Sequence, residues 1–157
     1  MNASTQNGTD LWQTHTIALP PYPAPKFYRL NTSTNTVRQS DFYFASHTSD
    51  DFNASITANA AGNCFVTWTS TDASIRVNAQ VRLSGKLSAD PQITAGTAGF
   101  TSPTFLTGNF DPSFGTQRWG DYSAVTLDPS NEATAWLVNE KINSSSLWGS
   151  RIITIGF

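Results

Sequence analysis

One stretch of this chain occurs twice. The residues from Ser55 to Trp68 are matched, without a gap, by the residues from Ser123 to Trp136. In each copy a serine opens an alternating run, a turn of small and polar residues follows, and a second run ends on the tryptophan. Internal repetition indicates a solenoid, a propeller or an array of similar units. It therefore constrains the architecture more than any single residue does.

Alternation of apolar and polar side chains predicts that these units are built from β-strands. Over residues 76–83 every second side chain is apolar: Val77, Ala79, Val81 and Leu83. One face of such a strand is buried and the other meets water. No window keeps apolar residues at helical spacing for three turns, so no helix is expected. The same patterns predict strands at residues 11–17, 27–30, 55–59, 64–69, 76–83, 123–127, 134–139 and 147–155.

Turn-forming residues divide these strands into groups. Tight reversals are expected at residues 61–63, 84–86 and 128–131, where glycine, proline, serine and asparagine gather. A loop is expected where four prolines, which cannot donate backbone hydrogen bonds, follow one another closely: Pro20, Pro21, Pro23 and Pro25.

The grouping predicts a single all-β domain, residues 1–157, that forms a partial β-propeller of about three four-stranded antiparallel blades. The blade-like units are residues 9–49, 50–93 and 118–157, with a long connection at 94–117 that holds one strand near 100–107. Three blades cannot close a ring, because a propeller needs about four or more. The favoured interpretation is that a longer chain supplies the remaining blades, and the alternative is that a second copy does.

Composition excludes several classes of partner. Only 13% of the residues are charged and the formal net charge is −2, so neither nucleic acid nor a membrane is an expected partner. Cys64 is the single cysteine, which excludes an intrachain disulfide, and we expect it to be a buried apolar residue. The surface rich in Ser, Thr, Asn and Gly suits a secreted or extracellular protein, although residues 1–10 lack the pattern of a signal peptide.

The last third of the chain carries a family resemblance. It lies in the strings Arg118-Trp119-Gly120-Asp121-Tyr122-Ser123-Ala124, Asp128-Pro129, Ala135-Trp136, Asn139-Glu140 and Trp148-Gly149-Ser150-Arg151-Ile152. Together they resemble the closing segment of sialidase-like β-propellers in large secreted bacterial proteins. The resemblance implies an extracellular propeller of six or seven blades. It does not imply sialidase activity, because the Asp-box turn of sialidases, Ser-x-Asp-x-Gly-x-Thr-Trp, is not complete anywhere in this sequence.

The sequence contains the kinds of residue that a sialidase-type site needs. Arg118 could bind a substrate carboxylate, and Tyr122 could act as a nucleophile activated by Glu140. The favoured interpretation is structural: Arg118 pairs with Asp121 or a carbonyl, while Trp119 and Tyr122 wedge between blades. No catalytic residue is therefore assigned. Arg118, Trp119 and Tyr122 are expected to bind ligand, since they have no chemical counterpart in the first copy of the repeat.

Tryptophans offer a second type of site. Trp119 and Trp136 could stack against a sugar ring. Trp136 matches Trp68 in the repeat, however, which favours core packing in every unit. Trp12 and Trp148 fall in predicted strands, and we expect the same role for them.

No metal or cofactor is predicted. Asp121, Asp128 and Asn131 could supply oxygen ligands to Ca²⁺, but no calcium motif is present and turn capping is favoured. His15 and His47 are too far apart in sequence to support a metal site by themselves.

Three functions remain open. The first is a non-catalytic or scaffold propeller segment of a secreted bacterial protein that presents a surface to carbohydrate or protein ligands. The alternative is that the chain forms the C-terminal blades of a sialidase-type glycoside hydrolase. A second alternative is a homo-oligomeric propeller lectin whose ring is completed by a second copy.

Overall fold

The computed structural model describes residues 4–90, 93, 96–107 and 120–157. These residues form three antiparallel sheets and no helix, as the sequence predicts. The first sheet contains β1 (Thr5–Asn7), β2 (Asp10–Leu19), β3 (Tyr22–Asn31) and β4 (Thr36–Phe42). The second contains β5 (Asp50–Ala58), β6 (Cys64–Asp72), β7 (Arg76–Lys86) and β8 (Thr97–Thr101). The third contains β9 (Ser123–Asp128), β10 (Asn131–Ser144) and β11 (Leu147–Gly156).

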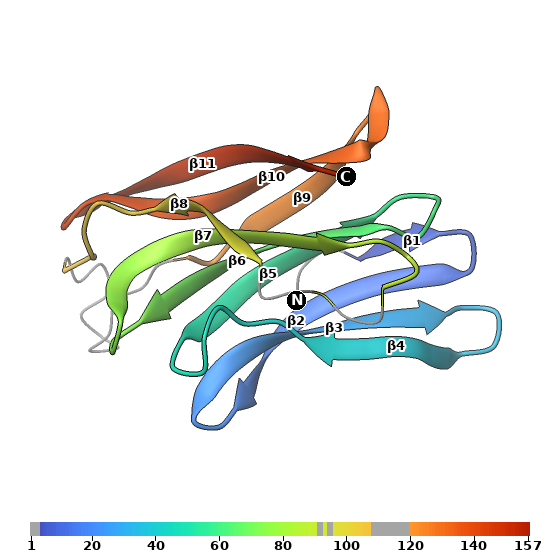
Figure 1. Cartoon of the computed structure of the whole chain (residues 1–157), viewed down its shortest axis with the longest axis horizontal. Helices are drawn as coiled ribbons and strands as arrows, with labels where there is room; N and C mark the ends of the chain where they lie inside the picture. Colours follow the sequence, from blue (N-terminus) through green and yellow to red (C-terminus); the bar gives the residue numbers. More distant parts are fainter. Residues whose placement is uncertain (1–3, 91–92, 94–95, 108–119) are drawn as a thin grey trace.

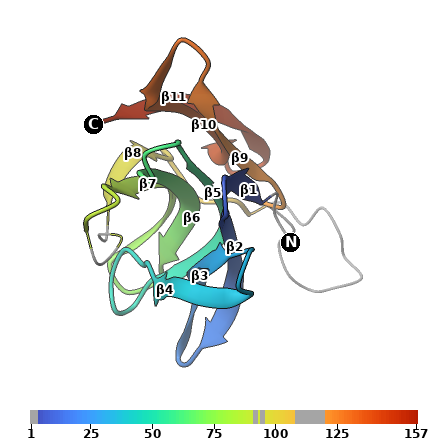
Figure 2. The same ribbon diagram turned by 90° about the vertical axis from the view of Figure 1, so that its right-hand side faces the viewer.

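The three sheets are stacked in chain order, with the second sheet in the middle (Figure 1). Their first strands, β1, β5 and β9, lie near one another, and the sheets fan out from them (Figure 2). Hydrogen bonds join these strands: the hydroxyls of Thr5 and Thr57 are 3.3 Å apart, and Ser55 Oγ donates to the carbonyl of Ser123 over 2.8 Å. Each sheet is therefore a meander whose face packs on the next sheet.

Aromatic side chains fill the space between the first and second sheets. Trp12, Phe27, Tyr43 and Trp68 are all buried, and the rings of Tyr43 and Trp68 lie 4.9 Å apart. Cys64 is buried with them, as expected. Burial of a large aromatic side chain contributes on the order of 2 kcal/mol or more, so this layer is the main apolar core.

The contact between the second and third sheets is more polar. Thr69 Oγ1 donates to Asn139 Oδ1 over 3.2 Å, and both residues are buried. Ala135 and Leu137 of β10 supply the apolar part of this contact face. The hydrogen-bonded amide of Asn139 fixes the position of the third sheet on the second, because leaving this buried group without a hydrogen bond would cost about 1–3 kcal/mol.

All eight predicted strands are present, and most are longer than the pattern indicated. β1 and β4 were not predicted. β4 escapes detection because its residues are exposed or only half-buried, none is fully buried, and they show no regular alternation. The additional strand expected near residues 100–107 is β8, which lies earlier, at Thr97–Thr101, and pairs with β7.

The loop predicted over the four prolines is confined to Pro20 and Pro21, which form the turn between β2 and β3; for Pro23 and Pro25 the prediction is wrong. Pro23 and Pro25 belong to β3 and pair with Ala18 and Thr16 of β2. The carbonyl of Pro25 accepts a hydrogen bond from the Tyr43 N–H, so the backbone of Pro25 faces the β4 side. The β3–β4 pairing extends only from Asn31 to Lys26, so the missing proline N–H groups lie where that ladder ends. A strand tolerates proline at such an edge.

The turn expected at residues 84–86 is also wrong, because β7 continues through Lys86. Gly85 pairs with Phe65 inside the sheet. A Cβ at Gly85 would come within 2.7 Å of the Cys64 carbonyl oxygen and 2.9 Å of Phe157 Cζ. The glycine is needed for close packing, and not for a reversal of the chain.

The two copies of the repeat do not occupy equivalent positions on their sheets. Trp68 is fully buried against the first sheet, whereas Trp136 is 45% exposed on the face of the third sheet that points away from the second. Ser55 and Ser123 face each other across the contact between these sheets. The turn between β5 and β6 spans residues 59–63, and the turn between β9 and β10 spans only residues 129–130. Ser55 pairs with Thr67 and Ser123 pairs with Asn139, so in each copy the serine and the tryptophan lie on opposite faces of the sheet. The serine face of β5 packs toward the third sheet and that of β9 packs back toward the second, so the second copy as a whole is reversed.

Candidate functional site

One end of the molecule, at the left in Figure 1, gathers the segments that lead into β5 and β9 together with the turn between β2 and β3. The Asn53 N–H donates to Thr16 Oγ1 of β2 over 3.2 Å. A Cβ at Gly120, just before β9, would lie 3.1 Å from the Asn53 amide nitrogen. Parts of all three sheets therefore meet at this end, which holds two hollows.

The first hollow, the Tyr122 hollow, has a volume of about 320 Å³. Its walls include Tyr122, Glu140 and Ser150, so the structure brings together two of the predicted site residues. Arg118 and Trp119, the other two, lie outside the described residues.

Tyr122 and Glu140 share this hollow without forming a catalytic pair. The Glu140 carboxylate accepts the Gly120 N–H over 2.9 Å, which ties it to the segment before β9. Among the described residues, the Tyr122 hydroxyl has no hydrogen-bond partner, and its side chain is 77% exposed. An activated nucleophile requires a base within hydrogen-bond reach. Tyr122 does not lie between two of the described sheets, because it is exposed. That it wedges between blades stays a prediction, which requires a further sheet on this face.

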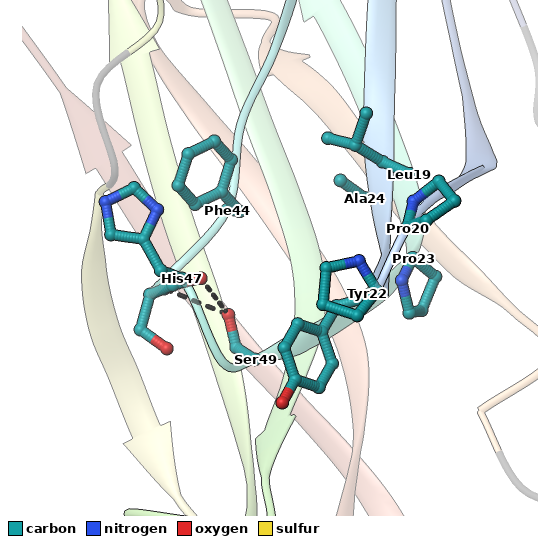
Figure 3. Close-up of a pocket in the computed structure, with 10 residues that line it drawn as sticks. Leu19, Pro20, Tyr22, Pro23, Ala24, Phe44, His47 and Ser49 are labelled. Atoms are coloured by element: carbon teal, nitrogen blue, oxygen red, sulfur yellow. Dashed lines mark hydrogen bonds between the residues drawn. The ribbon is translucent and has the colours of Figure 1, made fainter.

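The second hollow, the His47 pocket, has a volume of about 150 Å³ and was not predicted from the sequence. Figure 3 shows its two walls. Phe44 and His47 form one wall, with ring centroids 5.5 Å apart. The β2–β3 turn, with Leu19, Tyr22 and neighbouring prolines, forms the other. The cluster of prolines beside Tyr22 was the only sequence signal near this pocket.

The wall that carries Phe44 and His47 is held in place by a buried carboxylate. Asp51 is fully buried; its carboxylate accepts the Ala45 N–H at 3.3 Å, the Trp68 Nε1–H at 2.7 Å and the Ser49 hydroxyl. Burial raises the pKa of Asp51, and these hydrogen bonds oppose the rise. The backbone at Ala45 and Ser49 is thereby fixed on both sides of His47.

A second carboxylate holds the middle of the same segment. Asp72 Oδ2 accepts hydrogen bonds from Ser46 Oγ and Thr48 Oγ1, each 2.7 Å long, while Oδ1 accepts the N–H groups of Ser74 and Ile75. Hydrogen bonding, first that from Ser46, lowers the pKa of Asp72 to about 2. The His47 pocket is therefore pre-organised, which favours binding because little ordering remains to be done.

The tryptophans differ in role. Trp12 and Trp68 are fully buried, as expected, but Trp136 and Trp148 are 45% and 53% exposed, so core packing is wrong for these two. The indole N–H of Trp136 donates to Asp128 Oδ2 over 2.9 Å.

Asp128 and Asn131 act as turn caps. Asp128 Oδ1 accepts the Ser130 N–H over 2.8 Å, and Asn131 Oδ1 accepts the Ala133 N–H over 3.1 Å. These bonds confirm the capping interpretation for both residues. In the part of the chain that the structure describes, no three His, Cys, Asp or Glu residues gather as they would around a metal ion. No helix long and apolar enough to span a membrane occurs there either.

Comparison of the chain with family models, curated proteins and solved structures gives no match. Both hollows combine aromatic surface with hydroxyl groups, and the His47 pocket has no Asp, Glu, Lys or Arg side chain in its described walls. Such surfaces suit the binding of neutral, partly polar molecules.

Proposed function

We propose that this chain is a non-catalytic, three-blade segment of a sialidase-like β-propeller from a secreted bacterial protein, and that it presents a surface to glycan or protein ligands. The observation that carries the proposal is the arrangement of the sheets. Three antiparallel meanders follow one another in the chain, pack face to face, and bring their first strands together at β1, β5 and β9. Blades of a propeller are related in this way.

The outer face of the third sheet supports the need for further blades. It consists of Ala124, Thr126, Trp136, Val138 and Ile152, which line a hollow of about 200 Å³ together with Leu137. Ile152 is 65% exposed and Trp136 is 45% exposed. A contiguous apolar patch of this kind marks an interaction surface. The favoured occupant is a further sheet from a longer chain, and a second copy is the alternative.

The ligand surface is proposed at the end that holds the His47 pocket and the Tyr122 hollow. The hollow shares Ala124 and Val138 with the outer face of the third sheet, so a ligand there lies at the margin of the area that a further sheet would cover. Exposed Tyr122 and the hydroxyl-rich strands around it suit a sugar or a polar protein surface. The sparse charge of the chain and the string at residues 118–124 support secretion.

A glycan array probed with the labelled full chain tests the binding function. We expect one or more glycans to be retained, and a Tyr122→Ser variant to lose about fivefold in affinity, since the exposed ring supplies stacking area. Tyr28→Ser is the matched control, because Tyr28 lies on the first sheet, stacked on His15. Cleavage of the arrayed glycans without retention would overturn the proposal.

A sialidase-type glycoside hydrolase is the second candidate. The observation in its favour is that Tyr122 and Glu140 line the same hollow. It predicts release of the fluorophore from a fluorogenic sialoside, with the rate abolished by Tyr122→Phe. A rate that Tyr122→Phe leaves unchanged would remove Tyr122 as the nucleophile.

The homo-oligomeric lectin is distinguished by mass. If two copies complete one ring through the outer face of the third sheet, sedimentation gives twice the mass of the chain, and Trp136→Lys restores the single mass. A single mass for the unaltered chain counts against this alternative.

A further inference from the structure

The His47 pocket has no role in the propeller arrangement, since its turn and its connecting segment lie beyond the stacked sheets. Its volume of about 150 Å³ is well below the roughly 300–1,000 Å³ of pockets that hold drug-sized ligands. There is room for one six-membered ring, and not for an extended chain of groups.

The walls of the pocket determine which ring fits. Phe44 and His47 face the side of Leu19 and Pro23 across the opening (Figure 3). Both walls offer flat apolar surface. A pyranose ring with equatorial hydroxyls, such as that of glucose, has two such faces, because its axial C–H groups point up and down while its hydroxyls lie around the edge; galactose, with one axial hydroxyl, keeps one such face.

Two polar groups of the pocket are free to meet those hydroxyls. Among the described residues, neither the Tyr22 hydroxyl nor the His47 imidazole has a hydrogen-bond partner. Each can donate and accept at the same time, as the neutral imidazole carries one N–H and one bare nitrogen. The Ser46 and Ser49 hydroxyls, by contrast, are held by Asp72 and Asp51.

The pocket walls carry no Asp, Glu, Lys or Arg side chain among the described residues. Asp51 and Asp72 lie behind the Phe44–Ser49 segment and direct their oxygens at its backbone and hydroxyls. A neutral ligand therefore fits better than an acid or an amine, since a charged group would be desolvated without a partner.

We propose that the His47 pocket binds a single pyranose ring of a neutral glycan, stacked between Phe44 and the β2–β3 turn and hydrogen-bonded by Tyr22 and His47. This deepens the proposed glycan-binding function and rests on it for the class of ligand. It adds a site that is separate from the Tyr122 hollow, and it requires no further blade.

Titration of the full chain with methyl glycosides of glucose, galactose and N-acetylglucosamine, followed by amide chemical shifts in NMR, tests the proposal. We expect weak binding of at least one glycoside, with shifts at residues 44–49 and at Leu19, Tyr22 and Ala24, the residues of the β2–β3 turn region that carry an amide N–H. Loss of one hydrogen bond corresponds to about fivefold weaker binding. His47→Ala and Tyr22→Phe should each show about this loss.

The chain offers matched controls for both variants. His15→Ala and Tyr28→Phe alter a stacked pair on the first sheet, outside the pocket, and should leave the affinity within about twofold. Cyclohexanol is the ligand control, because it has the ring size but only one hydroxyl. Amide spectra of each variant establish that it is folded, and Tyr22→Phe removes only one oxygen atom.

Two results would overturn the site: no methyl glycoside shifts the amides of residues 44–49, or cyclohexanol binds as tightly as the best glycoside. If no methyl glycoside binds in the His47 pocket while the array still retains glycans through Tyr122, the pocket is not a glycan site and the proposed function stands. Failure of both Tyr122→Ser and His47→Ala to affect glycan binding removes the proposed ligand surface as a whole.

Discussion

Replacing Asp51 with alanine should destabilise the chain more than any other single carboxylate change. Asp51 is fully buried, and its oxygens are the acceptors for the indole N–H of Trp68, at 2.7 Å, and the Ala45 N–H, at 3.3 Å. Ser49 can turn its hydroxyl to the Ser46 carbonyl, with which it already forms a 2.9 Å bond. The two N–H groups have no such alternative.

The magnitude follows from those two groups. A buried donor left without an acceptor costs about 1–3 kcal/mol, so the loss for two donors on Asp51→Ala should lower the free energy of unfolding by about 2–6 kcal/mol. For a chain of this size, each kcal/mol lowers the midpoint of thermal unfolding by roughly 2–4 °C. The expected decrease is therefore about 4–24 °C.

Circular dichroism melts of three variants measure the effect. Asp50→Ala is the matched control, because Asp50 is the neighbouring residue on β5 and is only half-buried. Asp51→Asn keeps one oxygen for Trp68 and should cost less than Asp51→Ala. The reasoning is refuted if Asp51→Ala melts within experimental error of Asp50→Ala.

The same residue makes a prediction about pH. Burial raises the pKa of Asp51 above its ordinary value of 3.8, so the folded chain binds this proton more tightly than the unfolded chain does. A group with a raised pKa stabilises the fold below its unfolded pKa, and that contribution is lost as the pH rises through the folded pKa. Asp51→Asn cannot ionise. Its stability deficit relative to the unaltered chain should shrink as the pH rises from below 3.8 to neutral, and a constant deficit would contradict this.

Three further predictions concern other parts of the chain. Gly85→Ala should lower the free energy of unfolding by about 1–3 kcal/mol in urea titrations, because its Cβ would meet the Cys64 carbonyl oxygen at 2.7 Å; Gly156→Ala, with 3.3 Å to its nearest atom, is the control. Cys64 should resist a thiol reagent in the folded chain and react in urea, since burial raises its pKa to about 12; rapid labelling of the native chain would count against this. Hydrogen bonding lowers the pKa of Asp72 to about 2 from 3.8, so its contribution to stability is present above pH 3.8 and lost as the pH falls through about 2. Asp72→Asn should flatten acid unfolding in that window, and an unchanged acid transition would show that Asp72 does not contribute.

The ligand sites were predictable only in part. Tyr122 was found because it breaks the repeat, and the structure places it in the same hollow as Glu140, although the two do not form a catalytic pair. The His47 pocket escaped prediction, since its walls come from a proline turn and from a segment that has neither alternation nor a motif. What joins them is the hydrogen bonding of Asp51 and Asp72 to residues 45–49, which no spacing in the sequence reveals.

By itself the sequence determined the all-β class and the positions of most strands, because the alternation of buried and exposed side chains is a local property of each strand. It did not determine which face of each strand is buried. Trp68 and Trp136 match in the repeat, yet one is fully buried and the other is 45% exposed. The tertiary structure decided this, because the serine faces of β5 and β9 pack against each other, which puts Trp68 against the first sheet and leaves Trp136 on the outer face of the third. Likewise, the prolines of β3 locally indicate a loop, and only the position of β4 shows why the strand tolerates them. Gly85 of β7 locally indicates a turn, and only the closeness of the Cys64 carbonyl and the Phe157 ring shows why a glycine stands inside the sheet.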